Sequence, residues 1–276
     1  MKTIFKTLLL APVSAKLGVL IIIIYMIAAI FAPVIAPYSE TEVVGDVWEE
    51  MGSGFLLGTD QIGRDLFTRL IYGARNTISI AFVTTMLSFF IGITGGFLAA
   101  VVGGWIDQGI SRVIDIIMSI PILIFALMIL SVLGTSTPIL IIVIAVLDST
   151  RVFRLSRAVA MDVVVMDYVE VARLRGENLW YLMRHEVLPN TLAPLVAEFG
   201  LRFCFVFLFI SSLSFLGLGI QPPTADWGSM VRENAGAITF GILTPLLPAV
   251  AIAVLTIGVN LVVDWFLHKT AGIKES

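Results

Sequence analysis

Long apolar runs alternate with short polar segments along most of this chain of 276 residues. A helix needs about 20 apolar residues to cross the hydrocarbon core of a bilayer. Runs of that length cover residues 17–36, 77–103, 110–133, 138–158, 195–217 and 246–267. Each run is continuous, whereas the strands of a membrane barrel alternate. The pattern therefore predicts an all-α membrane protein with six transmembrane helices, and Pro121 should kink the third.

The composition agrees with a bilayer environment. Charged residues make up 13% of the chain and hydrophobic residues 58%, against about 25% charged in soluble domains. The single cysteine, Cys204, excludes an intramolecular disulfide, and its apolar surroundings indicate a buried, inert thiol. His185 and His268 lie far apart without further ligands at metal-binding spacing, so no metal site is expected.

The six runs divide the chain into consecutive segments. The N-terminus begins like a signal peptide, but Lys16 leads directly into the first run, so we interpret that run as an uncleaved first span. The expected segments are a cytoplasmic N-terminus (1–16), the first span (17–36), an extracytoplasmic segment with an amphipathic helix (37–76), a core with the other five spans (77–267) containing a cytoplasmic loop (161–194), and a cytoplasmic tail (268–276).

Lys and Arg set the orientation, because they are enriched in cytoplasmic segments. With both termini in the cytoplasm, thirteen of the 17 basic residues lie in cytoplasmic segments or adjoining helix ends. The four left outside are Arg64, Arg69, Arg75 and Arg232.

One cytoplasmic segment, "DYVEVARLRGENLWYLMRHEVLPN" (residues 167–190), is unusually polar for this chain. Ala172, Gly176, Trp180 and Met183 form an apolar stripe at helical spacing, which predicts a helix that ends at Leu188-Pro189-Asn190. Glycine inside a helix costs about 1 kcal/mol relative to alanine, so Gly176 indicates a close backbone approach or a bend between two short helices. The segment is either an interfacial helix whose arginines contact anionic lipid or a docking element for a cytoplasmic partner.

Charged and small residues also occur inside the apolar runs. Asp148 and Arg151 share a face of the fourth run, where they either pair with each other or contact a substrate, with Asp148 meeting an ammonium group. Gly92, Gly96 and Ala100 recur every fourth residue, which is typical of close helix packing in lipid. Glu198 with Arg202, and Arg112 with Asp115, are expected to form local pairs near the cytoplasmic surface.

The stretch "LGTDQIGRDLFTRLIYGARNTI" (residues 57–78) precedes the second run. Thr59 or Asp60 can cap an amphipathic helix, the glycines at 58 and 63 permit tight backbone, and Asp65 with Arg69 can form an i,i+4 pair. The helix would lie across the outer mouth, either as a structural element or in contact with an external binding protein. In "SFLGLGIQPPTADWGSM" (residues 214–230), Pro222-Pro223 favours an extended turn and Trp227 suits the membrane interface.

Signatures of catalysis are missing from the sequence. It contains no G-x-x-x-x-G-K-[ST], no G-x-S-x-G and no H-E-x-x-H. An intramembrane hydrolase or any other enzyme is therefore not expected, and transport driven by ATP would need hydrolysis on a separate subunit.

Three separated motifs, in order, carry a resemblance to a known family. Residues 170–190 resemble the EAA loop of permease subunits of binding-protein-dependent ABC importers, whose pattern is Glu-Ala-Ala, three residues, Gly and a spacer ending in Leu-Pro. Here the pattern corresponds to Glu170, Val171, Ala172, Gly176, Leu188 and Pro189, with Trp180 in the spacer. Val171 and Glu186 depart from it. Residues 57–78 and 214–230 are similar to signatures of the dipeptide, oligopeptide and nickel branch.

The resemblance implies the fold of an ABC type I importer permease in a bacterial or archaeal inner membrane. It implies a homologous second permease, two ABC ATPases that bind ATP and Mg²⁺, and an extracytoplasmic solute-binding protein as partners, without nucleic acid and without a cofactor on this chain. The EAA residues would contact an ATPase, and an extracytoplasmic family motif would comprise Gly58, Thr59, Asp60, Gly63, Arg64 and Asp65. Peptides are the expected substrates, with nickel or opines as alternatives. A self-sufficient secondary transporter or channel is the competing class, which would need inverted repeats or several buried acids.

Overall fold

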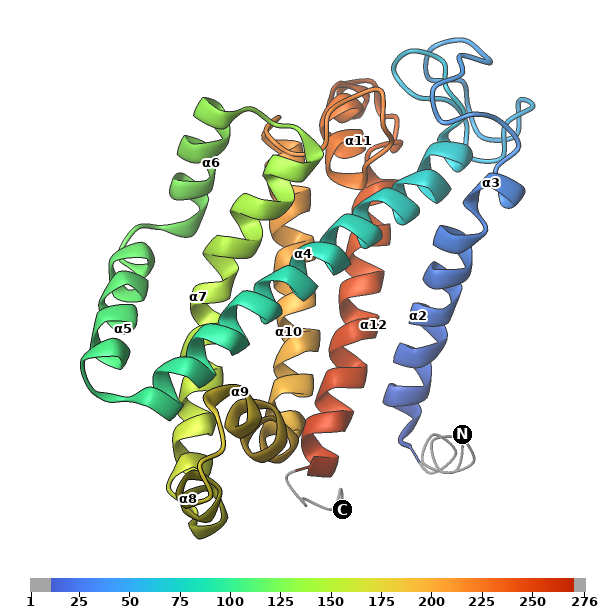
Figure 1. The fold of residues 1–276 in the computed structure, drawn as a ribbon. Coiled ribbons are helices and arrows are strands. Elements are labelled where there is room, and N and C mark those ends of the chain that lie inside the picture. Colours follow the sequence, from blue (N-terminus) through green and yellow to red (C-terminus); the bar gives the residue numbers. More distant parts are fainter. Residues whose placement is uncertain (1–10, 271–276) are drawn as a thin grey trace. The chain divides into compact units, whose positions relative to one another are not determined.

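The computed structural model describes residues 11–270, apart from the side chain of Thr270, and its regular structure is helical (Figure 1). The elements are α2 (Val13–Ile30), α3 (Ala32–Ile35), α4 (Leu66–Val102), α5 (Gly104–Met118), α6 (Ile122–Leu133), α7 (Thr137–Val164), α8 (Asp167–Leu174), α9 (Leu179–Tyr181), the π-helix η1 (Leu182–Val187), α10 (Leu188–Phe215), α11 (Trp227–Glu233), the 3-10 helix η2 (Ala235–Phe240) and α12 (Leu246–Thr270). Within residues 11–270 the β-type pairings are isolated bridges, and no strand forms. The predicted all-α class is confirmed.

Four helical stretches are long and apolar enough to cross a membrane. They are α2, α4, the continuous stretch Leu179–Phe215 and α12, and the bent pair α5–α6 would make a fifth. Helix α7, predicted as a span over residues 138–158, falls outside this set because charged residues recur along it, among them Asp148, Arg151 and Arg154. By length and composition, four to five spans are found among the described residues, and the predicted count of six stays a prediction.

The third apolar run (residues 110–133) breaks at Pro121, where a kink was expected. Helices α5 and α6 meet at 86°, and the break contains Ser119, Ile120 and Pro121. Proline has no N–H to donate to the preceding turn, and its ring clashes with the carbonyl four residues earlier. The bend is therefore much sharper than a mild kink.

The described residues form two compact units. One contains residues 11–82, 134–137 and 204–270, and the other contains residues 83–133 and 138–203.

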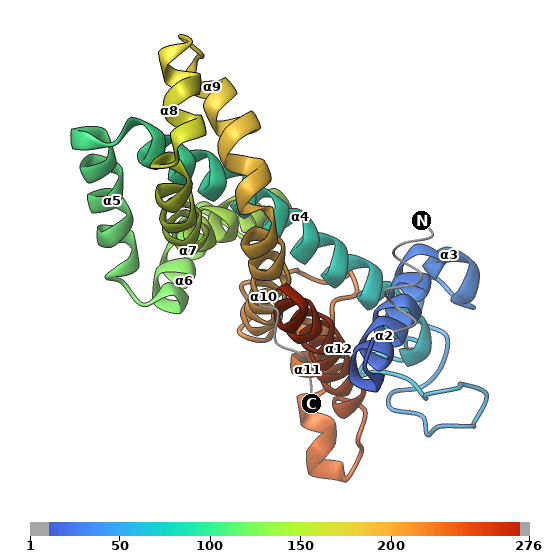
Figure 2. The same cartoon turned by 90° about the horizontal axis from the view of Figure 1, so that it is seen from below.

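In the first unit, α2 packs along α12, and both views show the two helices side by side (Figures 1 and 2). A Cβ on Gly18 would lie 2.6 Å from the carbonyl oxygen of Gly258, so neither helix could approach as closely with a larger residue there. The Tyr25 hydroxyl donates to the carbonyl of Ala251 at 3.1 Å. Its ring meets the indole of Trp227 edge-on, with centroids 5.6 Å apart.

In the second unit, α4 packs against α7 through small residues. A Cβ on Gly92 would lie 2.6 Å from Cβ of Val152, and Gly96 lies against Ser156. The Ser156 hydroxyl donates to the carbonyl of Gly92 at 2.9 Å. Ala100, one turn further, is partly buried against the apolar cluster described below. The close approach thus joins two helices of the same chain.

Two features of the stretches 57–78 and 214–230 differ from expectation. Instead of a separate amphipathic helix near residue 60, a loop continues to Asp65, and α4 begins at Leu66 and runs without a break to Val102. Trp227, expected at the membrane interface, is almost fully buried, and its indole N–H donates to the carbonyl of Leu70 at 2.9 Å. Tight packing against Gly73, where a Cβ would lie 2.6 Å from the indole, accounts for that burial.

Candidate functional site

The polar segment (residues 167–190) is built from two helical pieces, not one. Helix α8 ends at Leu174, and α9 begins at Leu179, capped by Asn178, whose side chain accepts the Tyr181 N–H at 2.8 Å. Gly176 lies in the turn between them with φ +81°, and a Cβ there would meet nothing within 4 Å. Of the two interpretations of Gly176, the bend is therefore right, since no backbone within residues 11–270 approaches it.

The expected helix end at Leu188-Pro189-Asn190 is wrong. Helix α10 begins at Leu188 and continues to Phe215, directly after η1. Proline is tolerated in the first turn of a helix, and the wider π-helical turn ahead of Pro189 changes which carbonyls need donors. The polar segment therefore leads into a spanning helix without interruption.

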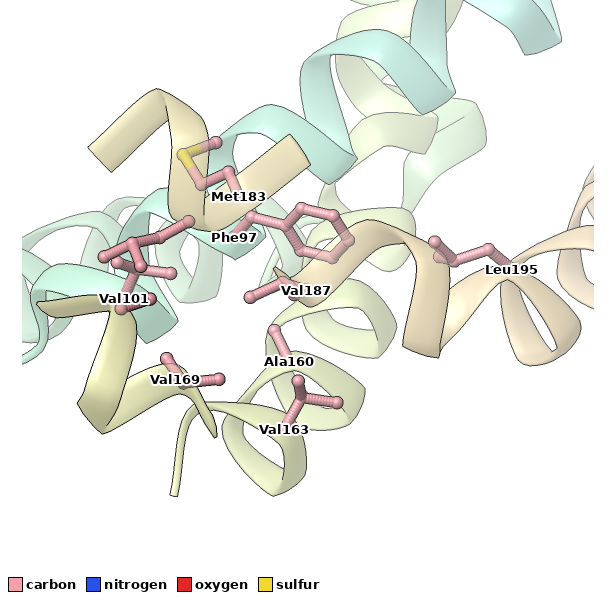
Figure 3. Close-up of a cluster of buried hydrophobic side chains, with 10 residues drawn as sticks. Phe97, Val101, Ala160, Val163, Val169, Met183, Val187 and Leu195 are labelled. Atoms are coloured by element: carbon pink, nitrogen blue, oxygen red, sulfur yellow. The ribbon is translucent and has the colours of Figure 1, made fainter. Parts of the chain in front are cut away.

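An apolar cluster anchors the polar segment to its own unit (Figure 3). Side chains from α4, α7, α8, η1 and α10 converge there: Phe97, Val101, Ala160, Val163, Val169, Ala172, Leu182, Met183, Val187 and Leu195. The guanidinium of Arg173 also donates to the carbonyl of Val101 at 2.8 Å. Burial of each Val, Leu, Phe or Met side chain contributes about 1.5–3 kcal/mol, so both pieces of the segment are fixed to the helices that carry them.

The opposite side of the polar segment is exposed. Figure 2 shows α8 and α9 next to each other, in agreement with the packing of α8 on η1. Trp180 is 60% exposed, and Val171, Leu174 and Leu179 are exposed as well. Glu170 and Gly176 lie on the exposed surface too, whereas Ala172 is fully buried. Large apolar side chains gathered on an exposed helix pair mark an interaction surface.

The residues of the extracytoplasmic motif form a compact loop. The Thr59 hydroxyl donates to the carbonyl of Asp46 at 2.5 Å and accepts the Glu49 N–H at 2.8 Å. Gly58 and Gly63 have φ of +80° and +84°, and each lies against a backbone carbonyl. Asp65 accepts the Thr68 N–H at 2.8 Å, which caps the start of α4.

A buried ion cluster closes this loop on α11. Asp60 lies 2.7 Å from Arg64 and 3.3 Å from Arg69, and Glu233 at the end of α11 lies 3.0 Å from Arg64 and 3.1 Å from Arg69. All four side chains are at least nine-tenths buried. Two carboxylates balance two guanidinium groups, as buried charges require. The expected Asp65–Arg69 pair does not form, because Arg69 is engaged by Asp60 and Glu233.

Next to the cluster, Asp226 caps α11. Its carboxylate accepts the Ser229 N–H and the Thr77 hydroxyl, both at 2.9 Å. Burial raises the pKa of Asp226, and these hydrogen bonds act in the opposite direction. The cap fixes the start of α11 against α4.

Asp148 and Arg151 belong to a charged group shared by α4, α7 and α10. Asp148 is fully buried and accepts the Ser88 hydroxyl at 2.9 Å. Arg202 lies 3.5 Å from Asp148 and 2.8 Å from Glu198, which confirms the expected Glu198–Arg202 pair. Arg151, one helical turn further along α7, attracts Asp148 electrostatically. These four charged groups are balanced. The expected Arg112–Asp115 pair is not found among the described residues, where Asp115 pairs with Arg154 at 2.6 Å.

Sequence reasoning missed several members of these groups. Glu233 and Asp226 lie about 150 residues or more from their partners in α4 and the preceding loop, and no local spacing relates them. Ser88 had a weak signal, since a hydroxyl inside a long apolar run needs a partner in lipid. No group of three His, Cys, Asp or Glu side chains suited to a metal occurs in the described part of the chain.

Comparison with known proteins decides the family. Residues 92–269 match the family of inner-membrane components of binding-protein-dependent transport systems. The chain belongs to this family. The match covers the polar segment, the α5–α6 break and α7. The permease is thus a membrane transport subunit rather than an enzyme.

Named relatives extend the match over most of the permease. The di/tripeptide transport system permease protein DppC of Pseudomonas aeruginosa is 37% identical over 90% of this chain and 84% of that protein. The dipeptide transport system permease protein DppC of Haemophilus influenzae is 34% identical over 91% of this chain and 88% of that protein. The resemblance to the peptide branch of ABC importer permeases is thereby confirmed.

A solved structure supports the fold alone. A crystal structure of an amino acid ABC transporter with histidines matches with a TM-score of 0.55, at 19% identity, over 74% of this permease and 94% of that chain.

Proposed function

We propose that this permease forms half of the translocation pathway of an ATP-driven importer for di- and oligopeptides. The observation that carries the proposal is the similarity of about nine-tenths of the chain to permeases named for di- and tripeptide transport. A solute-binding protein would deliver the peptide, and a homologous permease would supply the other half of the pathway. Two cytoplasmic ATPases would bind ATP and Mg²⁺.

The polar segment is the proposed contact with an ATPase. Alternating access needs the two halves of a transporter to move against each other, and an ATPase can bias that movement only through contacts that differ between states. The exposed residues Glu170, Val171, Gly176 and Trp180 would form the contact. The buried Ala172, together with Leu188 and Pro189 at the start of α10, would transmit it to the core.

The proposed topology has six spans with both termini in the cytoplasm. Helix α7 is the sixth span, since its buried charge has partners: Asp148 accepts the Ser88 hydroxyl and lies 3.5 Å from Arg202. Paired charges are the kind that spanning helices tolerate. Residues 1–16, 161–194 and 268–276 are then cytoplasmic, residues 17–36 are the first span, residues 37–76 are extracytoplasmic, and residues 77–267 form the core.

On the extracytoplasmic side, the loop of residues 58–65 would contact the solute-binding protein. Its support is the ion pair between Arg64 and Glu233, which fixes the loop to α11. Ile62 is exposed and Gln61 is partly exposed.

Co-purification and uptake test the proposal. The tagged permease, expressed with the products of its neighbouring genes, is expected to recover an ATPase and a second permease. When the complex is reconstituted into vesicles with a binding protein, it should take up radiolabelled dipeptide only if ATP is present on the side of the membrane that carries the ATPases. Uptake that persists without any ATPase would contradict the proposal and favour a secondary transporter. ATP-dependent uptake of nickel or an opine in place of peptide would retain the importer and change its substrate.

A further inference from the structure

A small cavity lies at the break between α5 and α6. Its volume is about 170 Å³. It is lined by residues in and beside the break and by residues of α6 and α7: Ile117, Met118, Ile120, Pro121, Ile122, Phe125, Leu147, Thr150 and Arg151. Pockets that enclose a drug-sized ligand measure about 300–1,000 Å³. The cavity therefore fits one end of a small molecule, not a whole peptide.

The break supplies a hydrogen-bond acceptor to this cavity. Ile117 lines it, and the helical partner of the Ile117 carbonyl would be the N–H of residue 121, which is proline. The Ser119 N–H is already engaged with the carbonyls of Asp115 and Ile116. Broken helices in transporters bind substrates and ions through carbonyls freed in this manner.

Arg151 supplies the charged donor. Among the residues that line the cavity, it is the one with a charge. The Thr150 hydroxyl donates to the carbonyl of Leu147 at 2.8 Å within its own helix. A guanidinium binds a carboxylate through two parallel hydrogen bonds.

Asp148, unlike Arg151, lies outside the cavity wall. Its carboxylate is engaged by Ser88 and Arg202. It lies one helical turn before Arg151 and attracts it electrostatically. Asp148 is thus a positioning residue for Arg151, and an ammonium group of the cargo cannot reach it without displacing Ser88 or Arg202.

We propose that the α5–α6 cavity is a transient binding site for the carboxylate end of the transported peptide. Arg151 binds the carboxylate, the freed backbone carbonyl of the break accepts an N–H of the cargo, and the apolar walls contact the terminal side chain. This inference rests on the proposed peptide transport and assigns the group of the cargo that the pathway recognises. Reversible binding of one end lets the cargo leave again, as transport requires.

The test compares dipeptides with a free and an amidated C-terminus in the reconstituted complex. Because the same binding protein serves every variant, a changed acid-to-amide uptake ratio reports on the permease. Arg151→Gln is expected to lower uptake of the free acid by about tenfold, the effect of one lost hydrogen bond to a charged group, and to leave uptake of the amide nearly unchanged. Arg151→Lys keeps the charge but loses the planar guanidinium. Its uptake of the free acid should lie between that of the unchanged protein and that of Arg151→Gln.

The matched control is Arg154→Gln. Arg154 lies one turn further along α7, does not line the cavity, and pairs with the exposed Asp115. It should assemble and transport like the unchanged protein. An unchanged acid-to-amide ratio in Arg151→Gln would overturn the cavity assignment while peptide transport stands. Absence of uptake in the unchanged complex would instead defeat the proposed function.

A crosslinking readout covers the case in which Arg151→Gln fails to assemble. A photoreactive residue at position 125, in the cavity wall, should capture radiolabelled dipeptide acid during turnover, and excess unlabelled acid should compete better than the amide. Capture without that preference would overturn the proposal.

Discussion

Arg69 and Glu233, which are 164 residues apart in the sequence, form a buried ion pair at 3.1 Å. Together with Asp60 and Arg64, they tie the loop before α4 to the end of α11. Each guanidinium lies between Asp60, which is near in the sequence, and Glu233, which is 164 or 169 residues away.

Glu233→Leu should destabilise the permease strongly. It leaves two buried guanidinium groups with one carboxylate, and breaking a buried pair costs about 3–5 kcal/mol. Thermal unfolding in detergent measures the effect. The comparison variant is Asp115→Asn, which removes a pair whose side chains are more than half exposed; such pairs contribute about 0–1 kcal/mol. Equal melting temperatures for the two variants would contradict a stabilising ion cluster.

Replacing Gly176 should weaken coupling through the backbone. At φ +81°, a β-branched residue is strained by about 1–2 kcal/mol even though the surrounding space is open. Gly176→Val is expected to reduce ATPase recovery and uptake without preventing membrane insertion. Asparagine tolerates this conformation better, so Gly176→Asn should retain more ATPase recovery and more uptake than Gly176→Val. If valine and asparagine behaved alike, backbone conformation would not be the cause.

Two neighbouring glycines of α4 should respond differently to alanine. A Cβ on Gly96 would overlap the backbone of α7 near Arg157 at 2.8 Å, whereas a Cβ on Gly95 would contact the Phe153 ring at an ordinary 3.4 Å. Overpacking costs about 1–3 kcal/mol. Gly96→Ala should therefore lower the melting temperature, and Gly95→Ala should not. The reverse order would contradict the α4–α7 packing.

The two sides of the polar segment should separate binding from stability. Trp180 is 60% exposed and Leu182 is 2% exposed. Trp180→Ala should reduce ATPase recovery at an unchanged melting temperature. Leu182→Ala should lower the melting temperature, since removing a buried leucine costs about 2–5 kcal/mol. Full ATPase recovery by Trp180→Ala would remove this surface from the proposed contact.

Features with a local cause were predictable from the sequence. The helical class follows from continuous apolar runs, the break near Pro121 follows from proline chemistry, and the Glu198–Arg202 pair follows from helical spacing. Features that depend on distant partners were not. The i,i+4 rule assigns Arg69 to Asp65, yet Asp60 and Glu233 lie closer to it in the fold.

The polar segment illustrates a second limit. A stripe at helical spacing suggested one helix that ends at Pro189, but a single positive φ at Gly176 divides it, and a π-helical turn lets it continue through Pro189. Periodicity records which side of a segment is buried. It does not record where the backbone turns between two pieces that bury the same side.

The ion cluster also constrains the order of biogenesis. Arg64 and Arg69 emerge from the ribosome 164 or more residues before Glu233, a delay of roughly 10–30 s at typical rates of synthesis. During that interval, Asp60 faces two cations alone, and the nascent outer loop lacks its final partner. The ion cluster in the first half of the permease therefore stays incomplete during membrane insertion until α11 has been translated.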